Sequence, residues 1–255
     1  MKVNTAAQRG RDPVLLLVHG AWNGSWSWAT LPQTLGMAGV KIHAVDLPGR
    51  GRGPAATPKT ATAHDLTAHA RYLRSVAEAI DAPLAVLAHS YGGAVATEAL
   101  VGLPRLATVI YLAAFMLETG QSCRDANEAT PHGGPGLSPE LDGDYLVVPA
   151  AAARYMFYGG CTEEQAVAAT ARLTPEHLHT VSSPVTAAAW RDVPTTYLVT
   201  RNDKAISAQV QRAMAGQATW QAELDSGHSP MLSHPAQLAE QVLTALERVD
   251  LRVAR

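Results

Sequence analysis

The sequence is poor in cysteine and phenylalanine and carries little net charge. Its 255 residues include two cysteines and two phenylalanines, and the formal net charge is −2 at pH 7. Two cysteines cannot build a disulfide-rich framework, so Cys123 and Cys161 are interpreted as reduced thiols, with a bridge between them left open. No charge run extends beyond a few residues, which argues against a nucleic-acid partner and against a polybasic membrane surface.

Long hydrophobic runs are also lacking. No stretch approaches the length of a membrane span, and residues 1–13 are polar and basic without the apolar segment of a signal peptide. We therefore expect a cytoplasmic protein without a membrane partner. His177 and His179 have no evident carboxylate or cysteine partner, so neither a metal nor another cofactor is expected. A homodimer is left open.

Short apolar runs alternate with helical patterns along most of the chain. This alternation predicts an α/β fold with a mostly parallel, doubly wound sheet and helices on both faces. The expected strands span residues 14–18, 40–45, 84–89, 108–112, 195–200 and 219–224. The expected helices span residues 27–36 and 94–100 and begin near 62 and 235.

The alternation stops between residues 115 and 190. We interpret this segment as a small helical cap, with a helix over 163–173, inserted before the last two core strands. The core then consists of residues 1–114 and 191–255. An insert at this point would lie over the carboxyl edge of the sheet, where ligands bind in such folds.

Ser90 lies between a buried strand and a helix, on the turn that joins them. A serine on such a sharp turn needs small residues two positions away on each side, and Ala88 and Gly92 meet this need. Ala88 stands where the usual pattern has glycine. The alternative interpretation of Ser90 is an ordinary helix N-cap.

Asp203 and His228 each follow a predicted core strand, so they should reach the same sheet edge as Ser90. A serine hydroxyl needs a base to take its proton, and the base needs an acidic partner that fixes its tautomer. The order Ser, Asp, His along the chain is the order that accompanies a serine on a strand-to-helix turn. The three residues are therefore the predicted catalytic group.

Three other aspartates are weighed against Asp203. Asp225 lies in the same loop as His228 and is interpreted as a solvated turn residue. Asp192 precedes its strand and should lie at the opposite edge. Asp46 follows a strand, and we expect it to shape the loop before Pro48 and Gly49.

The chain resembles the α/β-hydrolase superfamily. More narrowly, it is similar to the small esterases that include the plant methyl-salicylate and methyl-jasmonate esterases and the hydroxynitrile lyases, together with their bacterial relatives. The segments that carry the resemblance are His19–Trp22, Asp46–Gly51, Ala88–Gly93, Asp203 and Gly227–Pro230.

The resemblance implies a nucleophile at Ser90, a general acid–base at His228 and its orienting partner at Asp203. It also implies an oxyanion hole from the backbone N–H groups of Ala21 and Tyr91, which agrees with their places after the first core strand and after the serine. The side chains expected to contact the substrate are Trp22, Tyr91 and Ser229.

Two positions separate the hydrolases of this group from its lyases. The lyases carry threonine after the loop histidine and lysine after the catalytic histidine, whereas this chain carries Gly20 and Ser229. We therefore expect a serine hydrolase whose partner is a small-molecule substrate, a largely apolar ester that it cleaves through an acyl-enzyme intermediate. The alternatives are a biosynthetic enzyme of the same fold (lactone opening or closure, C–C cleavage or cyclisation) and a non-catalytic small-molecule binder.

Overall fold

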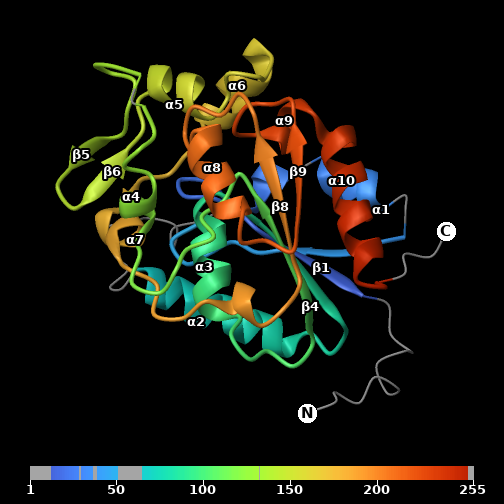
Figure 1. Cartoon of the computed structure of the whole chain (residues 1–255). Coiled ribbons are helices and arrows are strands. Elements are labelled where there is room, and N and C mark those ends of the chain that lie inside the picture. Colours follow the sequence, from blue (N-terminus) through green and yellow to red (C-terminus); the bar gives the residue numbers. More distant parts are fainter. Residues whose placement is uncertain (1–12, 29, 37–38, 51–64, 132, 252–255) are drawn as a thin grey trace.

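The computed structural model in Figure 1 has a central six-stranded sheet with helices on both faces. It describes residues 13–28, 30–36, 39–50, 65–131 and 133–251. The strand order is β2-β1-β3-β4-β8-β9, and every pair of neighbours is parallel. The strands are β1 (Val14–Val18), β2 (Lys41–Ala44), β3 (Leu84–His89), β4 (Leu106–Leu112), β8 (Thr195–Thr200) and β9 (Trp220–Leu224).

Alternate residues of the central strands enter two separate cores. Leu16 and Val86 belong to one cluster, and Leu15 and Leu87 belong to the other. Because successive strand side chains point to opposite faces, an uninterrupted apolar run is what a strand covered on both faces requires. The first face is covered by α2 (Leu66–Ala79), α3 (Tyr91–Ala99) and α8 (Ala208–Ala215), and the second by α1 (Leu31–Gly36) and α10 (Pro235–Arg248).

The predicted α/β fold is confirmed, with differences at the element ends. The expected helix over 27–36 is divided into a 3-10 turn, η1 (Ser25–Trp28), and α1. Thr62, the expected helix start, lies outside the described residues. Asp65 is itself the N-cap of α2, because its side chain accepts from the Ala68 N–H at 2.8 Å.

The segment between β4 and β8 contains a small antiparallel sheet that the sequence analysis did not predict. Three strands of only two or three residues form it, in the order β5-β6-β7. Helices α5 and α6 lie beyond the carboxyl ends of β8 and β9 in Figure 1. The division into core and cap stays a prediction. The elements are α4 (Cys123–Ala126), β5 (Glu140–Asp142), β6 (Tyr145–Val147), α5 (Ala150–Met156), α6 (Glu163–Thr170), β7 (Glu176–His177), α7 (Leu178–Ser182) and η4 (Ala189–Arg191).

Both cysteines are free thiols, as predicted. Burial raises the pKa of Cys123, and it raises the pKa of Cys161 to about 11, so both remain protonated at neutral pH. In the parts of the chain that the structure describes, no helix combines the length and apolar character needed to cross a bilayer.

Candidate active site

Ser90 occupies a strained turn between β3 and α3. Its φ of 53° and ψ of −125° are unfavourable for a residue with a side chain. Such a turn brings strand and helix close together. A Cβ atom at Gly92 would lie 2.7 Å from the carbonyl oxygens of Val18 and His19, so only glycine fits there. The Ala88 methyl group, at the position where the usual pattern has glycine, is buried in the core.

His228 and Asp203 form a buried pair at the loops after β9 and β8. The Nδ1 atom of His228 lies 2.7 Å from Oδ2 of Asp203. The other carboxylate oxygen accepts the backbone N–H groups of Ala205 at 2.7 Å and Ile206 at 3.0 Å. Because a carboxylate accepts hydrogen bonds, Nδ1 carries the proton and Nε2 keeps a lone pair that can take one.

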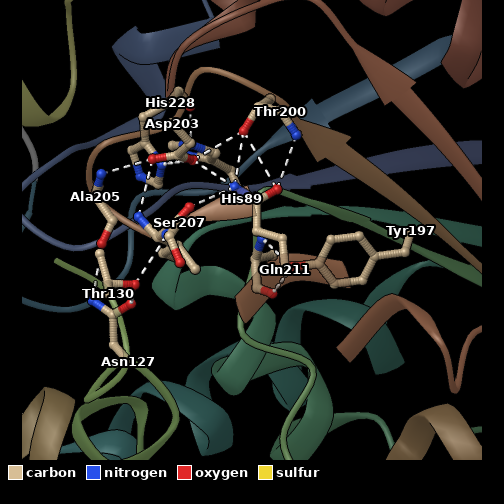
Figure 2. A network of polar contacts seen from close by, with 12 residues as sticks. His89, Asn127, Thr130, Tyr197, Thr200, Asp203, Ala205, Ser207, Gln211 and His228 are labelled. Atoms are coloured by element: carbon tan, nitrogen blue, oxygen red, sulfur yellow. Dashed lines mark hydrogen bonds and ion pairs between the residues drawn. The ribbon is translucent and has the colours of Figure 1, made fainter. Parts of the chain in front are cut away.

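Gln211, on α8, is a third contributor to this pair that the sequence analysis missed. Figure 2 shows its side chain beside Asp203 and Thr200. Its Nε2 atom donates to Oδ2 of Asp203 at 2.8 Å, and its Oε1 atom accepts the Thr200 N–H at 2.9 Å. The Thr200 hydroxyl donates to the same carboxylate oxygen at 2.9 Å. The Asp203 carboxylate is therefore held in one orientation toward His228.

The segment after β4 also supports the Asp203 loop. Asn127 donates to the carbonyl oxygen of Ala205 at 2.9 Å, and Thr130 accepts the Ser207 N–H at 3.0 Å. The Thr130 hydroxyl in turn donates to Asn127 at 2.6 Å, as Figure 2 shows. The loop that carries Asp203 is thus tied to a segment far away in the sequence.

The loop of His228 is joined to the turn of Ser90 through the residue before the serine. The Nε2–H of His89 donates to the backbone carbonyl of His228 at 2.8 Å, and the two rings lie 4.6 Å apart. Phe157 also packs near His228, with its ring 5.6 Å from the imidazole. These contacts bring Ser90, His228 and Asp203 to one edge of the sheet, as their positions after strands predict.

The rival aspartates lie elsewhere. Asp225 is exposed and contacts Arg201 and Asn202, so its interpretation as a solvated residue is confirmed. The expected role of Asp46 in its own loop stays a prediction, and the structure shows a contact with another loop. The Asp46 carboxylate accepts the N–H of Ser25 at 2.6 Å and the hydroxyl of the same residue at 3.0 Å, so it shapes the loop after β1. Asp192 is exposed and precedes β8.

The predicted oxyanion donors lie on two segments beside Ser90. A Cβ atom at Gly20 would lie 2.9 Å from Cβ of Ser90, so the two backbones run close together. His19 donates to the Gly20 carbonyl at 2.8 Å, and in a trans peptide the following Ala21 N–H points the opposite way. Tyr91 is the first residue of α3, so its N–H lacks an intrahelical acceptor. Their role as donors stays a prediction.

The side chains expected to contact a substrate have different surroundings. The Trp22 ring packs 5.6 Å from that of Phe157, and its Nε1 donates to the Leu146 carbonyl at 2.9 Å. The Tyr91 ring is buried, and its hydroxyl lies 2.9 Å from Nδ1 of His69, directed into the core. Ser229 is buried directly after His228. Their contact with a substrate stays a prediction.

A buried ion pair between Arg50 and Glu176 is the largest feature that sequence reasoning missed. Their side chains are 5% and 1% exposed. Burial alone would raise the pKa of Glu176, but the Arg50 charge and further contacts outweigh it and hold the pKa below its usual range. Among the residues that the structure describes, no group of three or more His, Cys, Asp or Glu side chains is arranged to hold a metal ion.

His19 makes stability depend on pH. Burial lowers the pKa of His19 from 6.5 to about 4, and the neutral ring accepts the Leu47 N–H at 3.0 Å. Between pH 6.5 and 4 the unfolded chain therefore binds more protons than the folded chain. The stabilisation that comes from the neutral His19 ring is complete above pH 6.5 and is lost as the pH falls. We expect the free energy of unfolding to fall by up to about 3 kcal/mol between pH 6.5 and 4. Urea unfolding at a series of pH values measures this change.

The control for this prediction is a histidine on the surface. His19→Gln should show a shallower fall in stability on acidification, whereas His43→Gln, on an exposed residue of β2, should follow the wild type. Equal pH slopes for His19→Gln and wild type would contradict the assignment.

The parallel sheet, with a strained serine turn at its edge, defines the class of α/β hydrolases. A family model described as "Alpha/beta hydrolase family" matches residues 15–241. The chain belongs to this family.

Individual relatives agree with this membership. The chain is 26% identical over 246 residues to the α/β hydrolase nvfD of Aspergillus novofumigatus, covering 91% of this chain and 96% of the relative. It is 27% identical over 247 residues to salicylic acid-binding protein 2 of Nicotiana tabacum, covering 89% and 95%. The crystal structure of polyneuridine aldehyde esterase shares the fold, with a TM-score of 0.77, 21% identity and coverage of 92% and 99%.

Proposed function

We propose that this protein is a serine hydrolase that cleaves a carboxylic ester of a small, largely apolar molecule. The observation that supports this function best is the strained Ser90 turn at the sheet edge that carries the buried His228–Asp203 pair. A strained serine turn at the same sheet edge as a histidine with a free lone pair has no evident purpose in stability. It is the arrangement that activates a hydroxyl as a nucleophile.

The first half of the proposed reaction forms an acyl-enzyme. Nε2 of His228 takes the Ser90 hydroxyl proton while Oγ attacks the ester carbonyl carbon. The carbonyl oxygen becomes an oxyanion, which accepts the N–H groups of Ala21 and Tyr91. When the intermediate collapses, the bond to the alcohol oxygen breaks and His228 returns the proton to the leaving alcohol.

The second half releases the acid. Water donates a proton to Nε2 of His228 and its oxygen attacks the acyl carbon. The second oxyanion collapses, the bond to Ser90 Oγ breaks, and the proton returns to Oγ. Asp203 stabilises the imidazolium in both halves through Nδ1 without taking the proton.

Three observations support a small apolar ester as the substrate. Phe157 places an apolar ring beside His228, and the Trp22 ring packs against Phe157. Several relatives are named for ester chemistry, among them methylesterase 17 of Arabidopsis thaliana. Gly20 leaves open the space beside the Ser90 hydroxyl, since a Cβ atom there would lie 3.4 Å from Oγ.

We further propose that residues 115–190 form the cap over this site and that the protein acts in the cytoplasm.

A fluorophosphonate probe and a p-nitrophenyl ester series from acetate to octanoate test the proposal. We expect covalent labelling at Ser90, located by mass spectrometry of the digested protein, and turnover that depends on chain length. Chain-length preference then measures the acyl pocket. A folded protein that neither labels nor hydrolyses any ester of the series would contradict the proposed function.

A further inference from the structure

Trp22 holds an unfavourable backbone conformation next to the predicted oxyanion donor Ala21. Its φ is 61°, which costs a residue with a side chain roughly 1–3 kcal/mol unless its surroundings enforce it. Three hydrogen bonds enforce it, and all come from the segment between β4 and β8. Glu176 accepts the Trp22 N–H at 3.0 Å, Thr174 donates its N–H to the Trp22 carbonyl at 3.0 Å, and Leu146 accepts from the ring nitrogen at 2.9 Å.

The Glu176 carboxylate is itself fixed at both oxygens. Oε2 accepts the Trp22 N–H and is ion-paired with the Arg50 guanidinium, while Oε1 accepts the Thr180 hydroxyl at 3.0 Å. Arg50 in turn donates to the Pro175 carbonyl at 2.8 Å. A buried carboxylate with all these partners cannot turn without leaving a charge unpaired, so it gives the Trp22 N–H a rigid anchor.

The Ala21 N–H lies in the peptide plane before Ala21, and the Ala21 Cα atom joins this plane to the next one. The plane before Ala21 is held by the bond from His19 to the Gly20 carbonyl. The plane after it is held at the Ala21 carbonyl by Asn23 Nδ2 at 2.9 Å and at the Trp22 N–H by Glu176. Because the two planes share the Ala21 Cα atom, loosening the second plane lets Trp22 leave its positive φ and lets the Ala21 backbone, with its N–H, shift relative to Ser90.

We propose that Glu176 is a positioning residue that holds Trp22, and through it the Ala21 backbone and its N–H, in the place that stabilises the oxyanion. The inference rests on the proposed function. It joins the segment after β4 to the reaction through the oxyanion donor, without any contact between Glu176 and the substrate.

Two variants separate positioning from stability. Glu176→Gln keeps an oxygen for the Trp22 N–H but leaves Arg50 buried without its counter-charge. The double variant Arg50→Met/Glu176→Leu removes both charges and also removes the acceptor. A positioning role predicts that kcat for a p-nitrophenyl ester falls about 10- to 100-fold in the double variant with KM unchanged. Glu176→Gln should recover most of that kcat although it is the less stable protein.

A boronic acid inhibitor gives a second readout, because its tetrahedral adduct with Ser90 places an oxygen in the oxyanion hole. Its affinity should weaken in the double variant by the same factor as kcat/KM. The control is Glu163→Gln, which breaks the surface ion pair with Arg154 and should leave all constants unchanged.

The outcomes distinguish this inference from the function on which it rests. Wild-type kcat in the double variant, or losses of kcat that follow loss of stability in both variants, would overturn the positioning role. A wild-type protein that neither labels with fluorophosphonate nor hydrolyses esters would overturn the proposed function and the inference together.

Discussion

Replacing Ser90 by alanine is expected to lower kcat for ester hydrolysis by a factor on the order of 10⁴ to 10⁶. Alanine has no oxygen to attack the carbonyl carbon, so His228 has no proton to take and no acyl-enzyme forms. The change removes one buried oxygen and leaves the backbone turn in place. Release of p-nitrophenol by wild type and variant measures the effect, with circular dichroism as the check on folding.

The matched control is Ser75→Ala, on an exposed position of α2, which should keep full activity. A folded Ser90→Ala protein that retains activity within tenfold of the wild type would rule out Ser90 as the nucleophile. Turnover would then have to come from a different group.

Replacing Asp203 by asparagine is expected to lower kcat about 10⁴-fold while the fold is kept. Two backbone N–H groups donate to Oδ1, so the asparagine oxygen occupies that place and its NH₂ group faces His228. An NH₂ group donates to Nδ1 and forces the imidazole proton onto Nε2. The ring is then in the tautomer that cannot accept the Ser90 proton.

Steady-state kinetics of Asp203→Asn and Asp225→Asn, side by side, measure this effect. Asp225 lies three residues before His228 but is exposed, so its variant should resemble the wild type. A large loss of kcat in Asp225→Asn with little change in Asp203→Asn would show that Asp225, and not Asp203, orients His228.

The inner strands β1 and β3 were predictable because each contains an uninterrupted apolar run, which burial on both faces demands. The same logic brought the predicted catalytic residues to one edge, since each follows a parallel strand. The strands of the small antiparallel sheet were not predictable. They are two or three residues long, too short to show the alternation that marks a strand.

Residues that support the site left no local signal in the sequence. Arg50 and Glu176 are far apart in the chain, and each alone reads as an ordinary surface charge. Gln211 lies on an amphipathic helix, where a glutamine is unremarkable until its position facing Asp203 is known. The contact of Asp46 with Ser25 left no local signal either, because Ser25 belongs to the preceding loop.

The order of the strands has a consequence for how the site is assembled during folding. β8 pairs with β4, so the segment 113–194 is closed as a loop when that pairing forms, and β9 joins the sheet only through β8. The partners of Ser90 arrive with these two strands. During refolding, the helical circular dichroism signal should therefore return earlier than labelling by fluorophosphonate. A chain truncated within this segment would contain Ser90 but would lack His228, the base, and Asp203.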